Sequence, residues 1–230
     1  MAFVKPDTTI KEYQDFVKTV YGLPNDRNFS LGDMLTNVER FVMRGLKGIR
    51  KGDKEKTKTN LLISLSWFIS MMNQLHIDME NELWNRFPYL CSYCASCPCL
   101  CKEQKIEERQ EVPINVNDKK RPKTLEEFQT MLNQIYPFKT RTIEQAGVHL
   151  AEECGEFAEA ILIYRGVYKE EDFEKLELEA ADFLSCLLGA FNSLGISLAK
   201  ELSVMFTNNC HVCQNAPCTC KFIDIVKFKS

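Results

Sequence analysis

The strongest constraint on the fold of this chain is a group of four cysteines that occurs twice with the same spacing. The first group follows the pattern CxxC-x4-CxC, and the second repeats it 119 positions later. A proline, Pro98 or Pro217, stands directly before the third cysteine of each group. The groups are Cys91, Cys94, Cys99 and Cys101, and Cys210, Cys213, Cys218 and Cys220. A spacing that recurs at a fixed offset indicates a tandem duplication.

Further matches extend this repeat toward the start of the chain. Residues 75–83 match residues 194–202 at the same offset of 119. Nearer the start the offset falls to 115, and residues 10–21 match residues 125–136. Because the matches keep their order along the chain, we interpret them as two copies of one ancestral segment.

The duplication predicts two domains of about 100 residues each, which is within the normal range. We place the first at 1–101 and the second at 124–230, joined by a charged linker at 102–123. The change of offset predicts that the second copy carries about four extra residues between Tyr136 and Leu150.

The cysteines favour bound metal over disulfides. Their total of eleven is odd, and the start Met-Ala-Phe-Val-Lys-Pro-Asp becomes polar within one turn and does not resemble a secretory signal. We therefore expect a reduced, cytoplasmic setting. Four closely spaced cysteines suit a structural Zn²⁺ site, although an iron–sulfur cluster uses the same ligands and stays open. Cys97 has no counterpart in the second group and is interpreted as a spare thiol.

Apolar periodicity predicts an all-α fold with four helices in each copy. In the second copy we expect helices at 125–135, 142–164, 170–194 and 197–206. Thr124 is the predicted N-cap of the first of these, and Gly166 and Gly195 are the predicted ends of the second and third.

Acidic residues gather on two of these predicted helices. Glu152, Glu153 and Glu156 share an arc of one helix, and Glu179 and Asp182 are three residues apart on the next. Acids opposite an apolar stripe usually form a solvated face. The second stripe, however, continues through small residues, which leave room for a cleft: Cys186, Gly189 and Ser193. Carboxylates that converge there would suit a hard ion such as Mg²⁺.

These residues resemble the EExxE…ExxD signature of the MazG-like all-α nucleoside triphosphate pyrophosphohydrolases. The match reads Glu152-Glu153-Cys154-Gly155-Glu156 and then Glu179-Ala180-Ala181-Asp182, and the likeness covers about 124–206. The resemblance implies four-helix MazG-like modules that pair as a pseudo-dimer. It also implies Mg²⁺-dependent hydrolysis of a nucleoside triphosphate to a monophosphate and pyrophosphate.

The same resemblance implies a role for each matching residue. Glu153, Glu156, Glu179 and Asp182 would be the Mg²⁺ ligands. Glu152 would position a second ion or the attacking water, and Lys175 would meet a phosphate of the substrate. We interpret His149, one turn before Glu153, as a partly buried helix residue and not as a catalytic base.

The first copy lacks the acidic signature. At the offset of 119, the five acids fall on residues that cannot form an acidic site: Asp33, Met34, Asn37, Asn60 and Ile63. We therefore expect the first copy to keep the fold without the chemistry, and the whole chain to assemble as a homodimer of pseudo-dimers. A pseudo-dimer would let the first copy contribute to a base pocket, for which Trp67, Phe68 and Trp84 are the candidates. Large aromatics at helical spacing are more often core, so we interpret all three as core.

Charge and composition exclude several classes of partner. The formal net charge of −3 argues against a bulk electrostatic grip on nucleic acid, and no apolar run is long enough to span a bilayer. The alternative function is a non-enzymatic, zinc-stabilised helical scaffold that binds protein or nucleic acid. Its main support is the basic segment 44–58, which has little aromatic interleaving and which we interpret as a solvated loop.

Overall fold

The computed structural model describes residues 1–106, 118–221, 223 and 225. All regular secondary structure in this part of the chain is helical, which confirms the predicted fold class for these residues. The predicted linker 102–123 lies partly outside the described residues. Its described part contains the short helix α6 (Cys101–Gln104) and a 3₁₀ turn at Asp118–Lys120.

The helices of the second copy begin and end close to the predicted positions. They are α7 (Leu125–Ile135), α8 (Ile143–Val167), α9 (Glu170–Leu194) and α10 (Leu198–Met205). The Thr124 side chain accepts a hydrogen bond from the Glu127 N–H, as expected for an N-cap. Gly195 ends α9 at φ +66°, in the left-handed region that glycine tolerates. The predicted end at Gly166 is wrong, because α8 continues to Val167 and Tyr168 takes the left-handed cap instead.

The first copy contains the corresponding helices and one additional short helix, α2. They are α1 (Ile10–Val17), a π-helical turn (Lys18–Gly22), α2 (Leu23–Asn28), α3 (Leu31–Lys51), α4 (Lys54–Leu75) and α5 (Met79–Arg86). The basic segment 44–58 is therefore helical apart from Gly52–Asp53, so the loop prediction is wrong. Its Lys58 forms ion pairs with Glu55 and Glu201.

Equivalent hydrogen bonds recur in the two copies. The Gln14 side chain donates to the Ile77 carbonyl at 2.6 Å, and the Gln129 side chain donates to the Ile196 carbonyl at 2.8 Å. Asn73 and Asn192 each donate to the main-chain carbonyl of that glutamine, both at 3.0 Å. These pairs keep the offsets of 115 and 119, which supports the duplication.

The register of the middle helices differs from the predicted one. Ser30 and Thr142 are the N-caps of α3 and α8, each within a capping box, and they lie 112 positions apart. The buried residues Met34, Val38, Val42, Gly45 and Gly48 then match Ala146, Leu150, Cys154, Phe157 and Ala160, which are also buried. The second copy therefore has no extra residues before Leu150. Its extra length lies in α8 and α9, each of 25 residues, against 21 in α3 and 22 in α4.

The compact units of the structure exchange parts of the two copies. One unit contains residues 1–79 with the described residues from 198 onward, and the other contains the described residues of 80–197. Thus α10 and the second cysteine group pack in the unit of α1–α4, whereas α5 and the first cysteine group pack in the unit of α7–α9. The units therefore differ from the predicted division into 1–101 and 124–230.

One hydrogen bond in each unit fixes this exchange. The Cys218 N–H donates to the Val20 carbonyl at 2.7 Å, and the Cys99 N–H donates to the Ile135 carbonyl at 2.8 Å. The donors are 119 positions apart and the acceptors 115, so the two bonds are equivalents of each other. Each joins a cysteine group of one copy to the first helical segment of the other.

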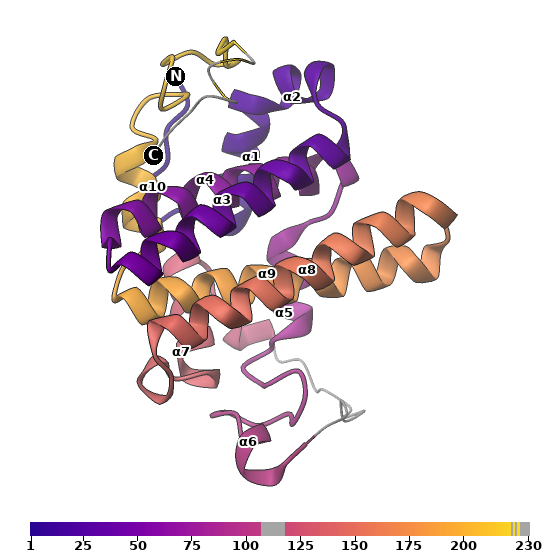
Figure 1. The fold of residues 1–230 in the computed structure, drawn as a ribbon, viewed down its shortest axis with the longest axis vertical. Coiled ribbons are helices and arrows are strands. Elements are labelled where there is room, and N and C mark those ends of the chain that lie inside the picture. Colours follow the sequence, from indigo (N-terminus) through magenta and orange to yellow (C-terminus); the bar gives the residue numbers. More distant parts are fainter. Residues whose placement is uncertain (107–117, 222, 224, 226–230) are drawn as a thin grey trace. The chain divides into compact units, whose positions relative to one another are not determined.

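A helical hairpin forms the centre of each unit (Figure 1). In the first unit α3 lies against α4, and in the second α8 lies against α9. Phe68 is fully buried in the first hairpin, and Trp84 is 2% exposed in the second unit, so both are core residues as predicted. Phe157 and Phe183 stack between α8 and α9 with ring centroids 5.6 Å apart. Among the described residues no single helix is long and apolar enough to cross a membrane, although α9 and α10 together reach that length across a break.

Candidate metal centres

The four sulfur atoms of each cysteine group converge as predicted. In each group they lie within 4.8 Å of one another. The individual Sγ–Sγ distances include 3.6 and 3.9 Å in the first group and 3.5, 3.7 and 3.8 Å in the second. Four thiolates around a tetrahedral Zn²⁺ with Zn–S bonds of about 2.3 Å lie about 3.8 Å apart. The eleven cysteines are free thiols, and Cys97 is exposed and outside both groups.

Main-chain amides favour thiolates in both groups. Leu100 N–H donates to Cys94 Sγ at 3.3 Å, and its equivalent Thr219 N–H donates to Cys213 Sγ at 3.4 Å. Although burial opposes ionisation, these and neighbouring amide bonds lower the pKa of Cys94 to about 6. A hydrogen bond from Cys218 lowers the pKa of Cys210 to about 4. The donor set and its spacing therefore fit one Zn²⁺ in each group.

Three of the predicted acidic ligands meet on the α8–α9 hairpin. One carboxylate oxygen from each of Glu153, Glu156 and Glu179 lies within 4.8 Å of the others. Glu156 is exposed, and one oxygen of each of the other two is buried. Oε2 of Glu153 has no hydrogen-bond partner among the described residues. A buried carboxylate oxygen without a partner is costly unless a cation binds it, so this oxygen donor set fits Mg²⁺.

Asp182 is held by an arginine that the sequence did not single out. The Arg86 guanidinium on α5 donates from Nε and Nη2 to the two carboxylate oxygens of Asp182, at 2.9 and 2.6 Å. The two side chains are 10% and 8% exposed. Asp182 therefore lies outside the group of three glutamates, although it occupies the next turn of α9 after Glu179. The bidentate geometry is the strong form of an arginine–carboxylate pair.

His149 contacts the acidic group directly. Its Nε2 lies 3.3 Å from Glu153 Oε1, and its Nδ1 lies 3.4 Å from Cys186 Sγ. These three residues form a further group that can hold a metal ion. The hydrogen bond with Cys186, followed by that with Glu153, raises the pKa of His149 to about 10. The imidazole is half exposed on α8, which agrees with the prediction of a partly buried helix residue, and it contacts both Glu153 and Cys186.

The space beside the small residues of α9 is occupied. A Cβ atom on Gly189 would clash with Nη2 of Arg141, so that guanidinium covers the glycine. Gly189 and Cys186 are buried, and Arg141 Nε is buried without a hydrogen-bond partner among the described residues. The predicted open cleft is therefore filled by Arg141 at this point. The two other predicted residues, Glu152 and Lys175, are exposed on α8 and α9 and lie outside the acidic group.

The first copy replaces the acidic group with residues of different chemistry. At the corrected offset of 112, Glu152, Glu153 and Glu156 match Arg40, Phe41 and Arg44 and not the residues predicted at 119. Both guanidinium groups lie over the Phe41 ring, at 4.7 and 5.4 Å from its centroid. On α4 the offset of 119 holds, and Asn60 and Ile63 replace Glu179 and Asp182. Two arginines at these positions would repel a divalent cation, so the corrected register changes the residues on which the expectation of an inactive first copy rests.

Comparisons of the chain with protein-family models, with curated proteins and with solved structures find no match.

Proposed function

We propose that the chain is a Mg²⁺-dependent nucleoside triphosphate pyrophosphohydrolase that acts through its second copy. The observation that carries this proposal is the convergence of Glu153, Glu156 and Glu179 from α8 and α9 within 4.8 Å. The resemblance of these residues to the MazG-like signature supplies the reaction class, and a tandem pair of MazG-like modules is part of the same proposal.

In this proposal the three glutamates hold Mg²⁺ through carboxylate oxygens. When bound, the ion supplies positive charge that polarises a phosphoryl group and screens the acids from a triphosphate. Lys175, exposed one turn before Glu179, contributes a cation toward a phosphate. The exposed Glu152 lies beside Glu153 and orients water or a second ion. Positioning and charge neutralisation are the main contributions that a protein makes to such a reaction.

Asp182 enters the proposal through Arg86. While the two side chains are bonded, Arg86 competes with a cation for the carboxylate. We therefore propose that Asp182 ligates the ion only when Arg86 releases it, and otherwise fixes Arg86 beside the acidic group.

The test is pyrophosphate release from a panel of canonical, deoxy and damaged nucleoside triphosphates, with and without Mg²⁺. We expect turnover of at least one substrate with Mg²⁺, and a loss of about 100-fold or more in Glu153→Gln, as is typical when a group that stabilises transition-state charge is removed. Glu144→Gln is the matched control, because Glu144 is an exposed acid in the first turn of the same helix. No turnover with any substrate, or equal rates in Glu153→Gln and Glu144→Gln, would favour the zinc-stabilised scaffold instead.

A further inference from the structure

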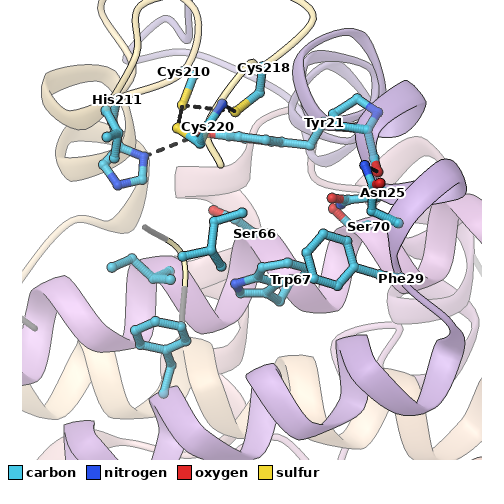
Figure 2. A pocket seen from close by; sticks show the side chains of 16 residues that line it. Tyr21, Asn25, Phe29, Ser66, Trp67, Ser70, Cys210, His211, Cys218 and Cys220 are labelled. Carbon is cyan, nitrogen blue, oxygen red and sulfur yellow. Dashed lines mark hydrogen bonds between the residues drawn. The ribbon is translucent and has the colours of Figure 1, made fainter. Parts of the chain in front are cut away.

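The first unit contains a cavity of about 280 Å³ (Figure 2). Its walls come from α2, α3, α4 and the second cysteine group. In the view of Figure 2, Trp67 and Phe29 lie below the cavity, and the side chains of Cys210, Cys218 and Cys220 lie above it. A cavity of this size is at the lower end of the range for small-molecule sites, so it suits a ligand of one or two rings.

This cavity occupies the position of the acidic site in the other copy. On α4 its lining residues Ile63, Trp67 and Ser70 are the equivalents, at an offset of 119, of Asp182, Cys186 and Gly189. On the other side its lining residues Phe29 and Phe41 are the equivalents, at the α3–α8 offset of 112, of Arg141 and Glu153.

The equivalent residues of the first copy are uncharged. Each charged residue among these five pairs in the second copy is replaced by an apolar one in the first. Among the described residues that line the cavity there is no aspartate, glutamate, lysine or arginine. The cavity therefore offers no ion pair to a phosphate and no carboxylate to a divalent cation, so a triphosphate–Mg²⁺ complex does not fit its chemistry.

Aromatic and polar groups define what does fit. The rings of Phe29 and Trp67 meet edge to face with centroids 5.1 Å apart. A third flat ring can extend such a packing, because aromatic pairs prefer edge-to-face or offset arrangements. Trp67 was interpreted as core from the sequence, but it lines the cavity and is only partly buried.

Two polar side chains that are mostly buried line the same cavity. Asn25 is 7% exposed and Ser70 is 6% exposed. Neither the Asn25 amide nor the Ser70 hydroxyl forms a hydrogen bond with another described residue. The amide and the hydroxyl line the cavity, so a ligand with donors and acceptors along one edge can form hydrogen bonds with both of them.

We propose that this cavity binds a small, uncharged planar ring compound with hydrogen-bonding groups on its edge, of the class of a free nucleobase, and that it does so without Mg²⁺. The ring packs against Trp67 and Phe29, and its polar edge bonds to Asn25 and Ser70. This site is independent of the proposed hydrolase, because none of its lining residues belongs to the acidic group.

The experiment uses the full-length chain with 5-fluorotryptophan in place of its two tryptophans. One ¹⁹F resonance then reports on Trp67 in the cavity, and the other reports on Trp84 in the core of the second unit. Adenine and uracil are titrated without Mg²⁺, and each titration is repeated in Glu153→Gln. We expect at least one base to shift the Trp67 resonance in a saturable way, equally in both proteins, while the Trp84 resonance stays unchanged.

Variants and control compounds separate this site from a merely apolar cavity. Ser70→Leu fills the space and should abolish the shift, and Ser70→Ala should weaken binding about five-fold through the loss of one hydrogen bond. A disturbed Trp84 resonance in Ser70→Leu would show that this variant does not fold normally. Asn25→Ala then takes its place, and it should weaken binding about five-fold, as Ser70→Ala does. The nucleoside 5′-monophosphate of the base should bind more weakly than the free base, because it brings charge. Cyclohexanol should also bind more weakly, because it lacks a flat ring.

Three results would overturn the proposal. They are no saturable shift of the Trp67 resonance with either base, unchanged affinity in all of the cavity variants, or affinity for cyclohexanol or for a monophosphate equal to that for the base. Loss of pyrophosphate release in Glu153→Gln with retained base binding would separate this site from the proposed active site.

Discussion

Loss of either Arg86 or Asp182 alone should destabilise the protein, whereas loss of both charges together should cost little. The chain itself contains the apolar residues that can replace the two charges in a test. At the offset of 119, the equivalents of Arg86 and Asp182 are Met205 and Ile63, which carry no charge and both belong to the first unit. The first unit therefore folds with an apolar pair where the second has two charges that are 10% and 8% exposed.

Single substitutions leave one charge buried alone. Arg86→Met removes both hydrogen bonds to Asp182, and Asp182→Ile leaves the guanidinium without its carboxylate. Breaking a buried pair in this way costs about 3–5 kcal/mol. At about 2–4 °C of melting temperature for each kcal/mol, the loss is about 10 °C. The double variant removes both charges, and apolar replacement of a buried pair is often neutral or stabilising.

The assay is a double-mutant cycle by urea unfolding of the full-length chain, followed through the core residue Trp84 of the same unit. We expect a coupling free energy of about 3 kcal/mol, with most of the stability recovered in the double variant. Lys11→Ala and Asp15→Ala form the control cycle, because this pair on α1 is 50% and 61% exposed and should couple by less than about 0.5 kcal/mol. Additive losses at Arg86 and Asp182, within about 0.5 kcal/mol, would refute the reasoning.

The same variants separate stability from catalysis. If Asp182 is a metal ligand, the double variant is stable but inactive with Mg²⁺. If its role is to fix Arg86, then Asp182→Asn, which can still accept hydrogen bonds, keeps part of the activity that the double variant loses.

Two further predictions concern single residues. The pKa of His149 is raised from about 6.5 to about 10, so its stabilising contacts should be complete below pH 6.5 and lost as the pH rises through 10. Mg²⁺ at the neighbouring Glu153 should lower that pKa, and an NMR titration of the imidazole that shows no change with Mg²⁺ would contradict the proposed ion site. Gly48→Ala should cost about 1–3 kcal/mol in urea unfolding, because its Cβ would lie 2.8 Å from a backbone nitrogen. Gly189→Ala meets only the end of a flexible side chain and should cost less, so equal costs would count against the packing described.

Local signals predicted the helices well because the causes are local. The Thr124 cap and the Gly195 left-handed turn act within a few residues, and the observed bounds of α7 and α9 follow them. The end of α8 was wrongly predicted at Gly166, because a glycine permits the left-handed conformation but does not require it. Tyr168 takes that conformation two residues later. The cysteine sites were equally readable, since their ligands lie within eleven residues of chain.

The register of α3 against α8 could not be read from periodicity. The offsets 112 and 119 differ by seven residues, which is close to two turns at 3.6 residues per turn. A shift of two turns keeps every apolar residue on the same face, so both registers show the same pattern. Only the caps at Ser30 and Thr142 decide between them. Arg86 and Arg141 were missed for another reason, because they reach α9 from distant segments and leave no local signal.

The exchange of α5 and α10 between the units was also outside the reach of the sequence, since both copies offer equivalent acceptors for a cysteine group. The carbonyls of Val20 and Ile135 occupy matching positions, and sequence order alone favours the acceptor in the same copy. The structure instead joins Cys218 to Val20 and Cys99 to Ile135. Zinc bound at each cysteine group is therefore expected to stabilise the helices of the other copy.

This expectation gives a prediction that only the exchanged arrangement makes. Cys91→Ser should lower the zinc content from two ions per chain to one. Because zinc binding contributes folding free energy, it should speed amide hydrogen exchange in α7–α9 while α1–α4 stay protected. Cys210→Ser should speed exchange in α1–α4 while α7–α9 stay protected. In both variants the helices that stay protected belong to the same copy as the substituted cysteine. Metal analysis with hydrogen exchange measures both effects. Faster amide hydrogen exchange of α1–α4 in Cys91→Ser would show that each copy keeps its own zinc site. The exchanged arrangement of α5 and α10 between the units would then be wrong.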